Sequence, residues 1–103
     1  MRFYSLEKLI NLHDGYRKVF KIDQHRLMLV QIDGELTLLE SHCPHLGHPL
    51  IDADIIGSDL RCPLHGYHFD ITTGNVISST DGPCRALITY EVVYQQRDVG
   101  LIL

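Results

Sequence analysis

Features that would assign the chain to several common protein classes are missing from its sequence. No stretch of its 103 residues approaches the roughly 18 consecutive apolar residues of a transmembrane helix. The first residues, MRFYSLEK, lack the apolar run that follows the basic start of a secretory signal. The three cysteines are an odd number, whereas a secreted disulfide framework normally has an even one. We therefore expect a cytoplasmic protein with no membrane association.

Basic residues are scarce in the second part of the chain. Residues 41–103 contain three basic residues against seven acidic ones, whereas residues 1–40 contain six of each. Nucleic-acid binding depends on clustered Lys and Arg, so this distribution argues against a nucleic-acid partner. An acidic surface suits either a partner with a basic patch or simply solubility, and the sequence leaves that choice open.

The apolar pattern predicts short β-strands throughout one domain, residues 1–103. Asp33-Gly34 between two apolar runs is a strong signal for a tight hairpin. Only residues 6–12 show helical periodicity, for one or two turns at most. Many short strands with frequent turns imply an all-β sandwich or small barrel. The predicted strands are residues 16–22, 26–32, 36–39, 67–70, 75–77, 87–93 and 100–103, with a further short strand ending at Leu60-Arg61.

Cysteine and histidine are concentrated in two irregular stretches, residues 42–50 and 62–66, that are rich in Pro and Gly. Five of the seven histidines and two of the three cysteines lie between His42 and His68. Each stretch supplies a thiol and an imidazole within three residues, as C-x-H and then C-x2-H. These four candidate metal ligands are Cys43, His45, Cys62 and His65.

Two thiolates and two imidazoles suit an iron–sulfur cluster or zinc. A structural zinc site usually pairs like with like, as C-x2–4-C followed by H-x3–5-H, and the C-x-H pair departs from that spacing. Two loops that each supply one Cys and one His can place both cysteines on one iron and both histidines on the other. The pattern favours iron–sulfur, with zinc or no metal as the alternatives.

The two stretches resemble the cluster-binding boxes of Rieske proteins, C-x-H-x-G-x-x-L and C-P-x-H-G-x-x-F-D-x-x-T-G. They are CPHLGHPL from Cys43 and CPLHGYHFDITTG from Cys62. The later GPCRAL is similar to the proline loop that covers the cluster in that family, here expected at about residues 81–86. The resemblance implies a Rieske-type antiparallel β-sandwich with a small cluster-binding subdomain formed by two loops.

The resemblance also implies one [2Fe–2S] cluster and its ligands. Cys43 and Cys62 would bind the inner iron, and His45 and His65 the outer iron. Neutral imidazoles in place of thiolates make such a cluster less negative, so it accepts an electron more readily.

Departures from the family pattern indicate the low-potential ferredoxin type. High-potential Rieske proteins of respiratory complexes have an extra cysteine in each box, and these positions hold His48 and Leu64 here. They also have a Ser and a Tyr whose hydroxyls bond to the cluster or its ligand. Those positions hold Tyr67 and Phe69, so neither expected hydroxyl is present.

The remaining cysteine and polar residues have structural interpretations. Cys84 is expected to be a packed thiol in the covering loop, and Asp70 to cap the turn 72–74. His48 and His68 are expected at the surface near the cluster, and His42 as a loop residue. His13 and His25 are expected in solvent-facing turns.

The sequence contains no nucleophile–base pair, no Gly-rich phosphate loop and no flavin or nicotinamide motif. We therefore expect an electron-transfer component and not an enzyme. The first hypothesis is a carrier between an NAD(P)H-dependent flavoprotein reductase and a terminal oxygenase of the ring-hydroxylating type. The alternatives are the small Rieske-like subunit of an NAD(P)H nitrite reductase, bound to its large subunit, and a zinc-stabilised interaction module.

Overall fold

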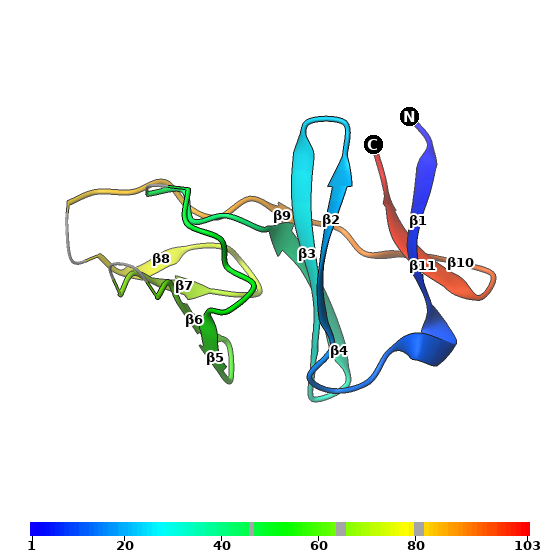
Figure 1. The fold of residues 1–103 in the computed structure, drawn as a ribbon, viewed down its shortest axis with the longest axis horizontal. Helices are drawn as coiled ribbons and strands as arrows, with labels where there is room; N and C mark the ends of the chain where they lie inside the picture. Colours follow the sequence, from blue (N-terminus) through cyan, green and yellow to red (C-terminus); the bar gives the residue numbers. More distant parts are fainter. Residues whose placement is uncertain (46, 64–65, 80–81) are drawn as a thin grey trace.

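The computed structural model describes residues 1–45, 47–63, 66–79 and 82–103 (Figure 1). These residues form short strands and one 3-10 turn, which confirms the all-β class. No helix in this described part of the chain could cross a membrane. The elements are β1 (Phe3–Lys8), η1 (Leu9–Asn11), β2 (Arg17–Ile22), β3 (His25–Ile32), β4 (Glu35–Glu40), β5 (Asp54–Ile56), β6 (Asp59–Arg61), β7 (His68–Asp70), β8 (Val76–Ser78), β9 (Thr89–Tyr90), β10 (Val93–Gln95) and β11 (Asp98–Ile102).

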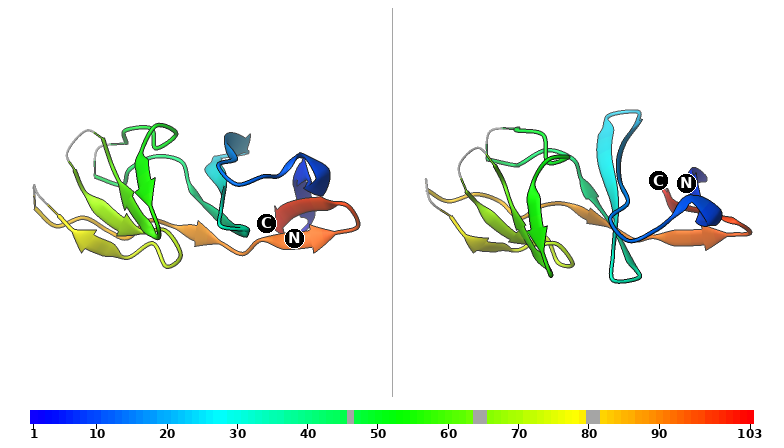
Figure 2. Two further views of the ribbon diagram at one scale, coloured as in Figure 1. Left: turned by 90° about the horizontal axis from the view of Figure 1, so that it is seen from below. Right: turned by 60° about the horizontal axis from the view of Figure 1, so that its bottom comes forward.

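The strands form three antiparallel sheets, ordered β1-β11-β10, β2-β3-β4-β9 and β5-β6-β7-β8. The first two sheets make up what we call the basal part, residues 1–41 and 88–103. The third sheet and the two Cys/His stretches make up the loop-bearing part, residues 42–87. The two parts lie side by side along the long axis, with both chain ends in the basal part (Figures 1 and 2). The predicted subdomain therefore contains a four-stranded sheet as well as two loops.

Two tight hairpins build the centre of the basal part. Asp23 and Gln24 connect β2 to β3, and Asp33 and Gly34 connect β3 to β4. Asp33 and Gly34 have φ values of 51° and 80°, as a type I′ turn requires at both central positions. The predicted hairpin at Asp33-Gly34 is confirmed.

Strand β3 is the wall shared by the two hydrophobic cores. Its residues 27–30 are all buried, because side chains pack on both faces of the strand. Leu27 and Leu29 join the basal core with residues of β4 and β11, and Met28 and Val30 join the core that contains the two Cys/His stretches. A strand that is buried on both faces has a continuous apolar run, and this is the sequence LMLV. Strand β3 therefore connects the loop-bearing part to the basal part through residues in both cores.

Two sequence predictions were wrong in detail. Residues 6–12 form the end of β1 and one 3-10 turn, because β1 pairs with β11 at the other end of the chain. The predicted strand 87–93 is divided: β9 pairs with β4, and β10 pairs with β11 in a different sheet. Strand β5 was not predicted; it pairs with β6 through a short hairpin.

Candidate metal centre

The first Cys/His stretch folds into a closed turn around Cys43. The Cys43 N–H donates to the His48 carbonyl at 2.8 Å, and the Gly47 N–H donates to the Cys43 carbonyl at 2.7 Å. Gly47 has a φ of +76°, a conformation that glycine adopts without steric cost. The backbone therefore doubles back on itself, and the Cys43 side chain is buried in the core.

The second stretch repeats this arrangement around Cys62. The Cys62 N–H donates to the Tyr67 carbonyl at 2.8 Å, and the Gly66 N–H donates to the Cys62 carbonyl at 2.9 Å. Gly66 has a φ of +71°. Each cysteine thus donates to the residue five positions later and accepts from a glycine four positions later. The spacing of Cys and Gly in the sequence encodes two copies of one turn.

The two thiols lie together in the hydrophobic core. Cys43 is 2% exposed and Cys62 is 1% exposed, and both pack in the cluster that contains Leu60 and Phe69. Burial raises the pKa of the Cys43 thiol, and the neighbouring Cys62 raises it further, while a hydrogen bond from the His45 N–H opposes the shift. Two buried thiolates would be costly without a cation. A metal that replaces the thiol protons removes that cost, so this pair fits a metal centre.

His45 connects the two turns. Its ring stacks on the ring of Tyr67 from the second turn, with centroids 4.5 Å apart and an interplanar angle of 17°. Its Nδ1 atom is buried. The structure therefore brings the Cys43 and Cys62 thiols together and holds the His45 ring against the second turn.

The fourth predicted ligand, His65, lies outside the described residues, as do Leu46 and Leu64. Within the described ranges, no three His, Cys, Asp or Glu side chains form a group that could hold a metal ion. His65 lies outside these ranges, so the complete ligand set stays a prediction. Two buried thiols beside an imidazole fit an iron–sulfur cluster, because thiolate is its usual ligand.

The covering loop was predicted at about residues 81–86, of which residue 81 lies outside the described residues. We use the name covering loop for residues 82–87, which lie against the core that holds the thiols. Its Cys84 side chain is half-buried and packs on the core that holds Cys43 and Cys62, as predicted for a packed thiol. Burial raises the pKa of Cys84. At the start of the loop, the Gly82 carbonyl accepts a hydrogen bond of 2.8 Å from the Tyr67 hydroxyl. The Tyr67 side chain does supply a hydroxyl where the sequence predicted the loss of one. This hydroxyl bonds to the covering loop.

The neighbouring histidines are more tightly held than the sequence predicted. His68 is half-buried on β7; its Nδ1 lies 2.9 Å from Asp59 Oδ2, and its Nε2 accepts from Arg61 Nε at 2.9 Å. His48 is half-buried too. Both are partly exposed, in line with the predicted surface positions. Sequence reasoning missed the Asp59–His68–Arg61 contacts, since they depend on the pairing of β6 with β7.

Other histidines are structural or exposed. His42 lies in the first stretch with its Nδ1 2.7 Å from Ser41 Oγ, and burial lowers its pKa. His13 and His25 are exposed as predicted, although His25 lies in β3 and not in the turn.

Asp70 caps its turn as predicted. Its Oδ1 accepts from the Thr72 N–H at 2.9 Å and from the Thr72 hydroxyl at 2.6 Å. These hydrogen bonds lower the pKa of Asp70, because they stabilise its charged form. Asp70 therefore stabilises the turn that follows β7.

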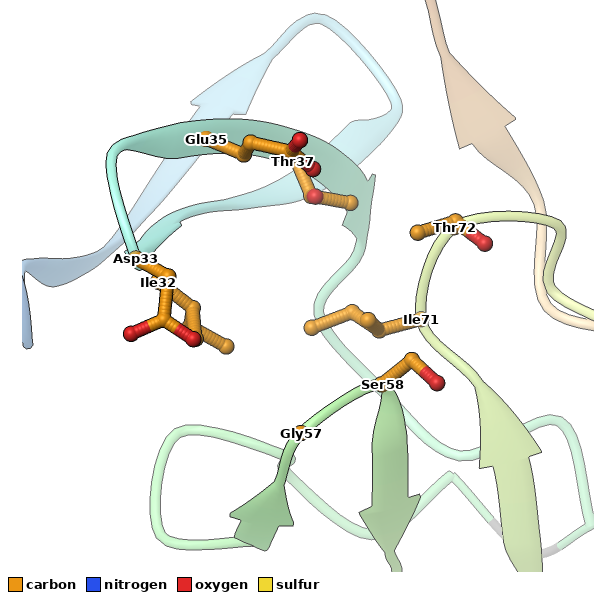
Figure 3. A pocket seen from close by; sticks show the side chains of 8 residues that line it. All are labelled: Ile32, Asp33, Glu35, Thr37, Gly57, Ser58, Ile71 and Thr72. Carbon is orange, nitrogen blue, oxygen red and sulfur yellow. The ribbon is translucent and has the colours of Figure 1, made fainter.

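An open groove of about 320 Å³ lies between the β3–β4 turn and the loop-bearing part (Figure 3). Ile32 and Ile71 face each other across it, and Asp33 and Glu35 line one side. Among the residues that the structure describes, no cysteine or histidine lines this groove. It is separate from the candidate metal centre.

Comparison with known proteins connects this geometry to a family. Residues 3–91 match the Rieske [2Fe–2S] domain. The chain is 33% identical to human (Homo sapiens) apoptosis-inducing factor 3 over 66 residues, which are 64% of this chain and 11% of that protein. It is 28% identical over 57 residues, 55% of each chain, to the ferredoxin component of the naphthalene 1,2-dioxygenase/salicylate 5-hydroxylase systems of Ralstonia sp.. The solved ferredoxin of Sphingomonas yanoikuyae B1 is similar over 97% of both chains, with 25% identity and a TM-score of 0.82.

Proposed function

Because the chain belongs to the Rieske [2Fe–2S] family, we propose that it carries one electron at a time to a terminal oxygenase. The observation that supports this function is the pair of matching turns, which brings two buried thiols together. Family membership implies one [2Fe–2S] cluster. When bound, the cluster accepts and releases a single electron.

The proposed ligands are Cys43 and Cys62 on one iron and His45 and His65 on the other. The buried cysteines would hold the cluster inside the protein. Tyr67 would orient the His45 ring through their stacking contact. We also propose that residues 1–103 act as one Rieske domain.

The proposed partners follow from the relatives. The Ralstonia protein is a ferredoxin component of a dioxygenase and hydroxylase system, and this chain spans about half of its length. It spans about a tenth of apoptosis-inducing factor 3. We propose a terminal oxygenase as electron acceptor and an NAD(P)H-dependent flavoprotein reductase as donor. None of the relatives described above is a nitrite reductase component, so we do not propose that alternative. A cytoplasmic location stays a prediction.

The metal content tests the proposal most directly. Protein purified without oxygen should be red-brown, with about two irons and two inorganic sulfides per chain. The reduced protein should show the low-average-g EPR signal of mixed Cys/His ligation. Stoichiometric zinc in a colourless sample would exclude the carrier function and support the zinc-stabilised module.

The midpoint potential tests the kind of electron carrier. His48 and Leu64 stand where an interloop disulfide would be, and the Tyr67 hydroxyl donates to the Gly82 carbonyl. Fewer hydrogen bonds to the cluster stabilise the reduced state less, and the acidic second part of the chain opposes electron uptake. We expect a value on the order of −150 to −100 mV. Protein-film voltammetry at pH 7 measures it, and a value above roughly +100 mV would indicate a quinol-oxidising chain instead.

A further inference from the structure

The covering loop is tied to the basal part by one carboxylate. Arg85 donates from Nη1 to Glu40 Oε1 at 2.6 Å and from Nη2 to Oε2 at 3.0 Å. The same Oε1 accepts from the Ile88 N–H at 2.8 Å, and the Glu40 N–H donates to the Ile88 carbonyl at 2.9 Å. Glu40, the last residue of β4, therefore binds the end of the covering loop through side chain and backbone.

This pair differs from an ordinary surface ion pair in burial and geometry. The Glu40 side chain is 14% exposed, while that of Arg85 is 55% exposed. Most exposed pairs contribute little to stability. A two-point contact between a guanidinium and a shielded carboxylate is stronger and fixes the orientation of both groups. The contact can therefore hold a loop that has no strand of its own.

The tied loop lies against the core that contains the thiols. Arg85 directly follows Cys84, whose side chain packs on the core that contains Cys43 and Cys62. At the other end of the loop, Tyr67 holds Gly82. Glu40 is three residues before Cys43, so β4 leads directly into the first turn. The last residue of β4 therefore also binds the covering loop.

We propose that Glu40 and Arg85 are positioning residues that keep the covering loop closed over the cluster-binding thiols. This inference depends on the proposed cluster site. Closure excludes water and chelators, so it sets how fast the bound cluster is lost. It also sets the potential, because water stabilises the reduced state, which carries one more negative charge.

The rate of cluster loss to an iron chelator tests this role in the holoprotein. Glu40→Gln and Arg85→Gln should each bleach roughly tenfold faster than the wild type, as expected for the loss of one charge-assisted contact. The double variant should be no faster than either single variant, because both changes remove the same contact. Arg85→Lys keeps the charge but loses the two-point geometry, so it should bleach at an intermediate rate with a raised midpoint potential.

Tyr16→Phe is the matched control. It removes a hydrogen bond of 2.8 Å from the Tyr16 hydroxyl to the Glu7 carboxylate, within the basal part. It should lower global stability in urea without changing the bleaching rate or the potential. The proposal is wrong if the Glu40 and Arg85 variants bleach no faster than Tyr16→Phe, or if their effects add in the double variant. A wild-type protein without a cluster would overturn the proposed function and this proposal together.

Discussion

The basal part and the loop-bearing part are built around cores of different composition. The buried residues of the basal core are all aliphatic and come from β3, β4 and β11. The other core buries Cys43, Cys62 and Tyr67 among its aliphatic residues. The strands β5 to β8 have three residues each, whereas β2, β3 and β4 have six, eight and six.

This difference leads us to expect that one part depends on the metal more than the other. Long paired strands with an aliphatic face bury enough apolar surface to be stable together. Three-residue strands offer few hydrogen bonds, and a core with two thiols gains its full stability when a metal replaces the thiol protons. We therefore expect the basal part to fold without the cluster and the loop-bearing part to need it.

Removal of a cysteine ligand should have the largest effect. Cys62→Ser should lose the cluster, and residues 42–87 should then lose protection in hydrogen exchange, while the β2–β3 hairpin keeps it. His68→Ala is the control from the same sheet, and it should keep the cluster spectrum. Equal loss of protection in both parts would mean that the molecule unfolds as one unit.

Truncation of the basal core should have the next largest effect. Leu29 is fully buried between β2 and β4, so Leu29→Ala should cost about 2–5 kcal/mol in a urea titration with an unchanged cluster spectrum. Leu60→Ala is the same truncation in the loop-bearing core, and Leu60 is also fully buried. It should additionally accelerate cluster loss. If Leu29→Ala accelerates cluster loss to the same extent, the two cores are not separable.

Loss of the Tyr67 hydroxyl should have a smaller effect. Tyr67→Phe removes the hydrogen bond to the Gly82 carbonyl but keeps the aromatic ring beside His45. We expect a loss of about 1 kcal/mol, because the exposed Gly82 can bond to water instead. The EPR signal should keep its shape. A large change in the g values would show that the hydroxyl affects the cluster itself.

The smallest effect is expected for a charge in the basal part. Glu7 accepts hydrogen bonds from Asn11, Tyr16 and the Lys8 N–H, and these lower its pKa from 4.5 to about 2. A lowered pKa stabilises the fold above the unfolded value, and this contribution is lost as the pH falls through the folded value. The stability difference between the wild type and Glu7→Gln should therefore be full at pH 7 and shrink below about pH 4.5. Urea titrations at several pH values measure it, and a difference that grows on acidification would contradict the assignment.

Local sequence patterns were sufficient to predict features that depend only on residues close together in the chain. The Asp33-Gly34 turn and the Asp70 cap depend on neighbours within a few residues, and both were predicted from sequence. The matching turns at Cys43 and Cys62 are also local, since each closes over five residues. The Cys and Gly spacing therefore determined the shape of the two turns, and the two complete boxes indicated the family.

Only the tertiary structure decided features that join distant residues. Residues 6–8 are in a strand because β1 pairs with β11, and residues 87–93 are divided because their partners lie in two sheets. Glu40 and Arg85 are 45 positions apart, and nothing in either local sequence indicates the contact. Short-range patterns encode turns and exposed or buried faces. The pairing of distant strands and the contact that ties the covering loop depend on which surfaces are buried when the two cores form.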